Sequence, residues 1–236
     1  MELTLIAEGS TKWQRFVKRW GISYLLGDDV LLDAFGRADV FWGNVRKFRI
    51  DVNRIKHVVI SHDDWDHVAG LAPLLKHHCR VSVYVCKNSS QVLKDRIHRF
   101  RSCLIEVDKP IQITESIYSL GEMTANAKRG VLFEQSLVVK TEKGISVITG
   151  CAHPGITAIV KRASEQFKDK IYAVIGGFHM KDNDLLQNEA IIKDLWSMGV
   201  KVIMPSHCTG KYAVQSIKNR YGSACVQLRE NESVEI

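Results

Sequence analysis

The chain has 236 residues, of which 45% are hydrophobic and 25% are charged, and these proportions are ordinary for a soluble globular protein. No run of residues approaches the roughly 18–20 apolar positions that a membrane-spanning helix needs. The first residues lack both the basic flank and the long apolar core of a signal peptide, so we expect a cytoplasmic protein with no membrane association. The formal net charge of +7 is compatible with anionic partners such as phosphates or nucleic acid.

Short apolar segments in the first half predict a series of strands, the clearest of which is the compact β-branched run at 81–85. A helix is expected at 71–77, and the basic stretch 94–103 fits either a helix or an irregular edge. Strands are expected at 23–26, 30–32, 58–60, 81–85, 111–120 and 136–140.

The second half alternates strands with helices. Helices are expected at 156–167 and 185–198, and strands at 145–149, 172–175 and 200–204. This alternation indicates a sheet with helices packed on it, of α/β or α+β class. Because no linker, repeat or low-complexity segment interrupts the chain, we expect a single domain over residues 1–236. Nothing in the sequence specifies an oligomeric state.

A cluster of potential metal ligands follows the apolar segment 57–60. It comprises His62, Asp64, Asp66 and His67 within six positions. Imidazole nitrogen and carboxylate oxygen suit Zn²⁺, Fe or Mn²⁺, and two such cations close together can generate a hydroxide nucleophile near neutral pH. The alternative is a solvated, aspartate-rich turn with two incidental histidines.

Three further histidines come just after predicted strands, each in a turn of small residues. They are His153, His179 and His207. Loops at strand ends are where α/β proteins place their sites. Each histidine alone is typical of a hydrogen-bonded structural residue, whereas the three matched contexts together favour a shared site.

The six cysteines show no C-x-x-C pair, and in a chain of this size without a secretion signal they are expected to be reduced thiols. They are Cys79, Cys86, Cys103, Cys151, Cys208 and Cys225.

The cluster after residue 60 resembles the S-H-x-H-x-D-H-x-G-G signature of the metallo-β-lactamase superfamily, with Asp64 in place of the second histidine. The segments G-C-A-H-P-G-I, G-G-F-H and P-S-H-C-T-G resemble one branch, the 7,8-dihydropterin-6-methyl-4-(β-D-ribofuranosyl)aminobenzene-5'-phosphate synthases. The turn 33–36 and the segment 133–137 also resemble that branch. The similarity runs from about residue 21 to residue 210.

The resemblance implies an αββα metallo-β-lactamase-like sandwich of two mixed sheets flanked by helices. It also implies a hydrolase that acts through metal-bound hydroxide on a small anionic substrate, phosphorylated and of pterin type. One or two divalent ions are expected as cofactor, with zinc first and manganese or iron as alternatives. In place of the second histidine, Asp64 favours a harder cation than zinc.

Site residues are carried over by position. His62, Asp64 and His153 would hold one metal. Asp66 and His67 would hold the second together with a late histidine, either His179 or His207, and Asp66 would also orient the nucleophile as the catalytic residue. Cys151 stands about where relatives place a bridging aspartate, so it is either a thiolate ligand or a buried inert thiol. Lys181 and Lys211 would contact a substrate phosphate or are solvated surface lysines.

Two other functions stay open at this point. The H-x-D-x-D-H variant also resembles the metallo-β-lactamase-like domains of DNA-uptake proteins and some nucleases. In a nuclease, the basic stretch that contains Phe100 would lie along a phosphate backbone. That stretch comprises Lys94, Arg96, His98, Arg99 and Arg101, and a solvated basic face explains it equally. The second alternative is a degenerate member that binds a metal or a pterin and catalyses nothing.

Overall fold

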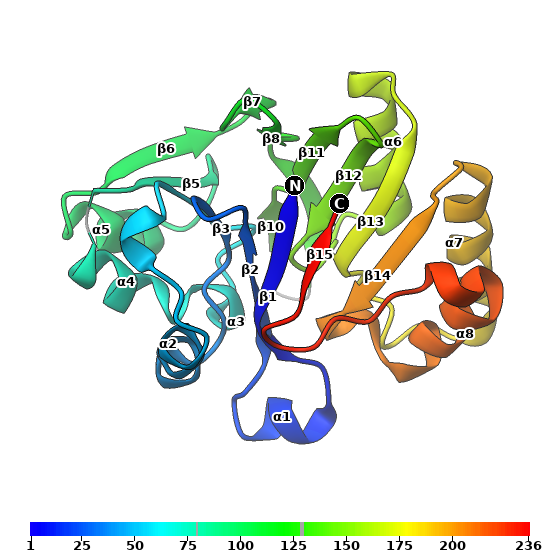
Figure 1. Cartoon of the computed structure of the whole chain (residues 1–236), viewed down its shortest axis with the longest axis horizontal. Coiled ribbons are helices and arrows are strands. Elements are labelled where there is room, and N and C mark those ends of the chain that lie inside the picture. The colour runs from blue at the N-terminus through cyan, green and yellow to red at the C-terminus, as the bar shows by residue number, and fades with distance from the viewer. Residues whose placement is uncertain (79, 128–129) are drawn as a thin grey trace. The chain divides into compact units, whose positions relative to one another are not determined.

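The computed structural model describes residues 1–78, 80–127 and 130–236. Contacts divide the chain into a first unit, Met1–Lys109 with Arg229–Glu235, and a second unit, Pro110–Leu228 with Ile236 (Figure 1). The single domain over residues 1–236 stays a prediction, and each unit is described by itself. Cys79 lies outside the described residues, and the other five cysteines form no disulfide.

The first unit is built on a mixed seven-stranded sheet. In spatial order its strands are β15 (Ser233–Glu235), β1 (Glu2–Gly9), β2 (Gly21–Leu26), β3 (Val30–Leu32), β4 (His57–Val59), β5 (Ser82–Cys86) and β6 (Cys103–Val107). Neighbouring strands are antiparallel from β15 to β3 and parallel from β3 to β6.

Except for α1 (Lys12–Phe16), which buries no residue, the helices of the first unit bury apolar side chains against this sheet. Helix α2 contributes Phe41 and Val45, and α4 contributes Leu71, Leu74 and Leu75, all in one core cluster with the strands. The helices are α1 (Lys12–Phe16), α2 (Ala38–Lys47), η1 (Val52–Arg54), α3 (Trp65–Val68), α4 (Leu71–His77) and α5 (Gln91–His98).

The second unit is built on a mixed six-stranded sheet, with β14, β13 and β12 parallel and the rest antiparallel. The order is β14 (Val202–Ser206), β13 (Ile171–Gly177), β12 (Gly144–Thr149), β11 (Leu137–Thr141), β8 (Ile117–Ser119) and β7 (Ile111–Gln112). A separate hairpin pairs β9 (Met123–Ala127) with β10 (Gly130–Glu134).

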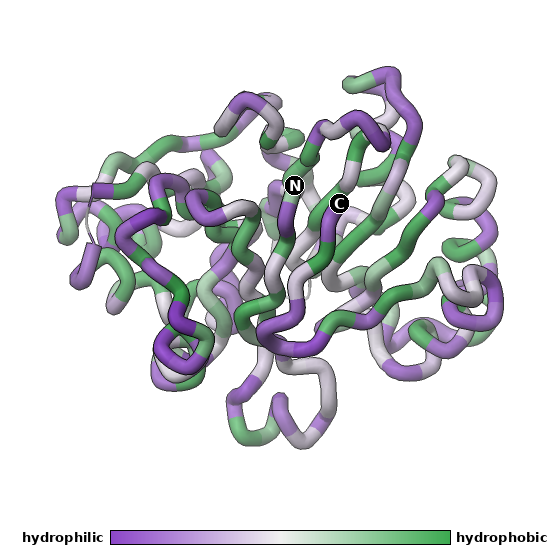
Figure 2. Tube along the Cα trace, in the orientation of Figure 1, coloured by the Kyte–Doolittle hydropathy of each residue, from purple (hydrophilic) through white to green (hydrophobic). Residues whose placement is uncertain are grey.

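Three longer helices share an apolar core with the strands of this sheet, which are largely hydrophobic along their length in Figure 2. Helix α6 buries Ile156, Ile159 and Val160 at helical spacing. The helical segments are α6 (Ile156–Phe167), α7 (Leu185–Ser197), η2 (His207–Thr209), α8 (Lys211–Tyr221) and η3 (Gly222–Ala224).

Two mixed sheets with helices confirm the predicted fold class, and α4 and α6 have the predicted bounds. The single strand expected at 111–120 is wrong. The chain turns there, with the backbone N–H of Ile113 donating to the carbonyl of Ile117 at 2.8 Å, and forms β7 and β8 instead. The basic stretch contains the end of α5 followed by β6. Among the described residues, no helix is both long enough and apolar enough to cross a membrane.

Candidate metal centre

In the first unit, the predicted ligands follow β4, which lies parallel to β3. Because parallel strands end at the same edge of a sheet, Asp33 after β3 and Ser61 after β4 come together. Asp33 and Phe35 have φ angles of 58° and 57°, a left-handed conformation that is uncommon outside glycine and clusters at functional sites. The backbone N–H of Asp33 donates to the carbonyl of Val59 at 2.9 Å.

The carboxylate of Asp33 organises this edge. It accepts hydrogen bonds from the backbone N–H and the hydroxyl of Ser61, both at 2.7 Å, and from Nδ1 of His67 at 2.6 Å. All three residues are buried. Since a carboxylate can only accept, Nδ1 of His67 carries the proton, and Nε2 is the nitrogen suited to a metal. Sequence reasoning missed this role, although the resemblance had included the turn that begins at Asp33.

Burial by itself lowers the pKa of His67, but the carboxylates of Asp33 and Asp66 outweigh it and hold that pKa well above its ordinary value. Metal binding at His67 must therefore compete with a proton on the ligand nitrogen.

The four residues predicted as ligands in this unit lie together. The rings of His62 and His67 have centroids 4.1 Å apart. Nε2 of His62 is 3.7 Å from a carboxylate oxygen of Asp64, and Nε2 of His67 is 3.5 Å from one of Asp66. The side chain of Asp64 is 54% exposed, whereas that of Asp66 is 9% exposed. Asp64 is therefore the most accessible member of the set.

In the second unit, the predicted ligands follow the parallel strands β12, β13 and β14, whose ends share one edge. Ala152, His179 and His207 have φ angles of 59°, 52° and 48°, so each of the three loops contains a non-glycine residue in the left-handed region. The hydroxyl of Thr209 accepts from the backbone N–H of Phe178 at 3.1 Å and joins two of these loops.

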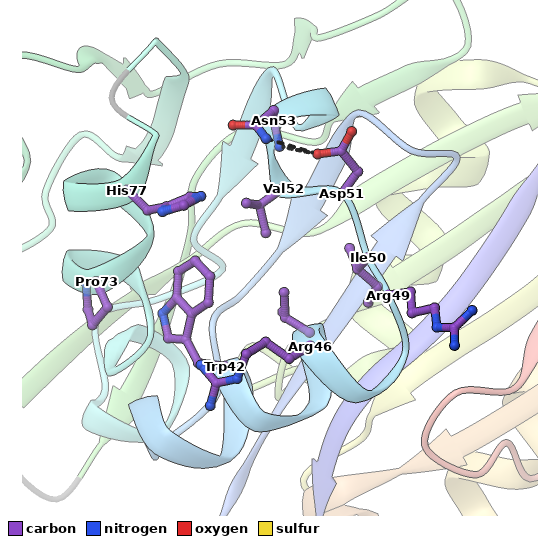
Figure 3. A pocket seen from close by; sticks show the side chains of 10 residues that line it. Trp42, Arg46, Arg49, Ile50, Asp51, Val52, Asn53, Pro73 and His77 are labelled. Carbon is purple, nitrogen blue, oxygen red and sulfur yellow. Dashed lines mark hydrogen bonds between the residues drawn. The ribbon is translucent and has the colours of Figure 1, made fainter.

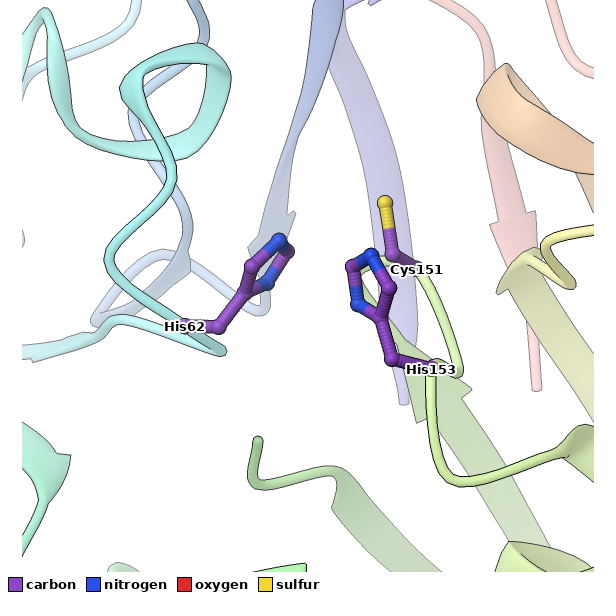
Figure 4. A group of neighbouring side chains, drawn as sticks. All are labelled: His62, Cys151 and His153. Atoms are coloured by element: carbon purple, nitrogen blue, oxygen red, sulfur yellow. The ribbon is translucent and has the colours of Figure 1, made fainter. Parts of the chain in front are cut away.

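A second buried carboxylate, Glu134 at the end of β10, holds the loop after β12. It accepts from the backbone N–H groups of Cys151, Ala152 and His153 at 3.0, 2.8 and 2.7 Å, and from Nδ1 of His153 at 2.9 Å. Nε2 of His153 is again the nitrogen suited to a metal. Figure 4 shows Cys151 and His153 extending from this loop, and it shows His62 in the loop after β4. Sequence reasoning did not find Glu134, although it lies in the matched segment 133–137.

His153 lies beside His179, with ring centroids 4.4 Å apart. The donor atoms of Cys151, His179 and Cys208 all lie within 4.8 Å of one another. Cys208 was not predicted as a ligand, and its position next to His207 was the available signal. Burial raises the pKa of Cys208, but the side chain of Cys151 and the imidazoles of His207 and His179 outweigh burial and bring it well below its ordinary value.

Each unit thus gathers its own predicted residues at one sheet edge. The pairing of His62 and Asp64 with His153, and the choice between His179 and His207 as the late ligand, stay predictions.

A pocket of about 630 Å³ in the first unit lies elsewhere. In Figure 3 the ring of Trp42 lies near that of His77, and the centroids are 5.5 Å apart. The ten residues that line this pocket include none of the predicted ligands.

Comparisons with known proteins agree with this architecture. Residues 29–130 match the model of the beta-lactamase superfamily domain. The 7,8-dihydropterin-6-methyl-4-(beta-D-ribofuranosyl)-aminobenzene-5'-phosphate synthase of Methanocaldococcus jannaschii is 28% identical over 83% of this chain and 82% of its own length.

Among solved structures, Tm1679, a metal-dependent hydrolase of the beta-lactamase superfamily, is 26% identical with a TM-score of 0.79, covering 100% of this chain and 99% of its own. The short form of human tRNase Z shares the fold with a TM-score of 0.66 at 15% identity, covering 100% of this chain and 99% of its own. The resemblance predicted from the sequence is confirmed: this is a protein of the metallo-β-lactamase fold, similar over most of its length to the dihydropterin phosphate synthase branch.

Proposed function

We propose that this protein is a metal-dependent hydrolase that acts on a small, phosphorylated substrate. The observation that carries the proposal is the same arrangement in both units, a histidine whose Nδ1 donates to a buried carboxylate. His67 donates to Asp33 at 2.6 Å and His153 donates to Glu134 at 2.9 Å. Metal-binding histidines characteristically donate their second ring nitrogen to a carboxylate, which fixes the tautomer and orients the ring.

The donor chemistry in the first unit fits a divalent ion. His62, Asp64, Asp66 and His67 offer imidazole nitrogens and carboxylate oxygens, which suit zinc, manganese or iron. Such an ion, when bound, lowers the pKa of water toward about 7 and polarises a phosphoryl or carbonyl oxygen. Asp66, with a side chain only 9% exposed, would orient the attacking water.

In the second unit, His153 is the proposed ligand whose orientation is best defined, because Glu134 fixes both its ring and the backbone of its loop. His179 or His207 would supply the late ligand.

The proposed substrate class rests on charge and on similarity. The chain has a formal net charge of +7, and Lys181 and Lys211 adjoin the loops of His179 and His207, where they would contact a phosphate. The Methanocaldococcus jannaschii relative is named for a 5'-phosphate compound, and Tm1679 is described as a metal-dependent hydrolase. A phosphorylated substrate of pterin type is therefore the first compound class to test.

The nuclease alternative is less well supported by the basic stretch. The ammonium of Lys94 is 2.9 Å from a carboxylate oxygen of Glu106, and its side chain is 12% exposed. Phe100 packs against the apolar core of the first unit, so its ring is engaged there rather than presented for stacking on bases. These contacts favour a structural role for Lys94 and Phe100.

The test combines metal analysis with hydrolysis. Protein purified without chelators is expected to carry one or two equivalents of divalent metal and to hydrolyse small phosphate esters. Chelation should abolish activity, and Zn²⁺ or Mn²⁺ should restore it. His62→Ala and His153→Ala should each lower metal content and activity, whereas His98→Ala, an exposed histidine on α5, should change neither.

The alternatives give different results. Metal-dependent cleavage of DNA or RNA with rates that fall steeply with salt, and no turnover of small esters, would replace the proposal with a nuclease. Bound metal without any hydrolysis would indicate a non-catalytic member. Equal loss of metal in His98→Ala and His62→Ala would contradict the assignment of ligands.

A further inference from the structure

We propose that Cys151, His179 and Cys208 form a binding site for a thiophilic metal ion, such as Zn²⁺, Cd²⁺ or Cu⁺, within the second unit. The proposal requires only contacts inside that unit and does not rest on the proposed hydrolase function. If His179 binds this thiophilic ion, His207 is the remaining candidate for the late ligand of the proposed hydrolytic centre.

The spacing of the three donors fits a metal. Their donor atoms, two sulfurs and one ring nitrogen, lie within 4.8 Å of one another. A tetrahedral zinc, with bonds of about 2.3 Å to sulfur and about 2.0 Å to nitrogen, places its donors roughly 3.5–3.8 Å apart. An approach of the donor atoms by at most about 1.3 Å would therefore bring them to the spacing that zinc requires.

The second unit makes room for the sulfur of Cys208 at this position. A Cβ atom added to Gly177 would lie 2.7 Å from Sγ of Cys208 and 2.4 Å from the carbonyl oxygen of Gly150. Glycine at the end of β13 thus lets the loop after β14 approach the loop after β12. Sγ of Cys208 lies 3.5 Å from the carbonyl oxygen of Cys151, so the two cysteine residues are in direct contact.

The donor set is chemically distinct from that of the first unit. Two thiol sulfurs and one imidazole are soft or borderline ligands, which select zinc, copper(I) or cadmium, whereas the carboxylates of the first unit suit harder cations. Both cysteines are buried, and three protein ligands around zinc leave a fourth position open. The resulting site would hold a thiophilic ion with one exchangeable position.

The test is a Cd²⁺ titration of the full chain under reducing, oxygen-free conditions. Binding is monitored by the sulfur-to-metal charge-transfer absorption in the ultraviolet. This band reports thiolate bonding alone, so imidazole and carboxylate ligands do not contribute to it. The wild type is expected to show a band that saturates when one equivalent of Cd²⁺ is bound by thiolate. Cys151→Ser and Cys208→Ser should each weaken Cd²⁺ binding by roughly tenfold or more. Cys225→Ser, a half-buried cysteine of the same unit, should leave the titration unchanged.

The proposal would be overturned if the wild type showed no band. It would also be overturned if the midpoint of the Cd²⁺ titration were unchanged in both serine variants. Folding of each variant is checked by circular dichroism. For any variant that does not fold, alkylation of the wild type with and without Zn²⁺ gives the answer. The reaction is run long enough for the buried thiols to be alkylated through transient opening of the fold. Zinc should slow alkylation of Cys151 and Cys208 but not of Cys103 and Cys225, and equal rates with and without zinc at all four would count against the site. Loss of hydrolysis with an intact thiolate band would contradict the proposed function alone.

Discussion

The two units position their predicted metal ligands with different residues. Each places its predicted ligands where parallel strands end, and each holds a histidine through Nδ1 on a buried carboxylate, Asp33 for His67 and Glu134 for His153. The carboxylates differ in what else they bind. Asp33 accepts from one hydroxyl and one backbone N–H of Ser61, whereas Glu134 accepts from three consecutive backbone N–H groups.

A proposed metal ligand is therefore positioned in two ways in this protein. In the first unit the carboxylate mainly orients side chains, and the short helix α3 sets the backbone of His67. In the second unit one carboxylate fixes the backbone of a whole loop as well as the ring of its histidine. The donor types also differ, since Asp64 and Asp66 are carboxylates and Cys151 and Cys208 are thiols.

Removal of the two buried carboxylates is expected to have the largest effect. Asp33→Ala and Glu134→Ala each leave buried donors without their acceptor, and the free energy of unfolding should fall by about 3–5 kcal/mol, as for a broken buried ion pair. Denaturant unfolding measures this. Glu165→Ala, at an exposed ion pair of 3.9 Å, is the control and should change stability by about 0.5 kcal/mol or less. A loss below about 1 kcal/mol for either variant would contradict the shared role of the two buried carboxylates.

Close approach of the second-unit loops is tested by Gly177→Ala. The added methyl group would meet Gly150 and Cys208 at distances below 3 Å, and overpacking of this kind should cost about 1–3 kcal/mol of unfolding free energy. The matched variant is Gly43→Ala in α2, where an added Cβ has no neighbour within 4 Å. This substitution should raise the free energy of unfolding by roughly 0.5–1 kcal/mol. Thermal unfolding separates the two, and a neutral Gly177→Ala would mean that the loops can move apart freely.

The two units are also expected to differ in the metal ion that each prefers. Asp64 adds a hard, negatively charged donor, so Asp64→His should shift the first unit toward zinc, with the ratio of Zn²⁺ to Mn²⁺ affinity rising by roughly tenfold. Less ligand charge should also lower the pH at which activity appears. Competitive metal binding and pH–rate profiles measure the two effects. If neither changes, Asp64 is not a ligand.

The smallest expected effect comes from the neighbouring carboxylate. Asp63 accepts from the backbone N–H of Ser90 at 2.7 Å, which assigns it to holding the start of α5. Asp63→Ala should lower the free energy of unfolding by about 0.5–1.5 kcal/mol without changing metal content. A fall in bound metal equal to that of Asp66→Ala would show that ligands in this cluster had been misassigned.

Many helices and strands were predictable because the spacing of apolar residues along a short segment indicates them. The apolar spacing of α4 and α6 predicted both helices with their bounds. Strand β1 was not predicted, although it lies inside the seven-stranded sheet between β15 and β2, because its place depends on partners far along the chain. The hairpin of β7 and β8 was taken for one strand, since its turn at 113–117 contains no glycine, proline or asparagine to mark it.

The sequence by itself determined which side chains can bind a metal and that they follow strands, because ligand type and strand-end position are local properties. The tertiary structure alone decided which carboxylate holds which histidine. The hydrogen bond between His67 and Asp33 joins residues 34 positions apart, the one between His153 and Glu134 spans 19, and the contact between Cys208 and Cys151 spans 57. Such pairs arise only when strands and loops that are distant along the chain come together, and no spacing along the chain encodes them.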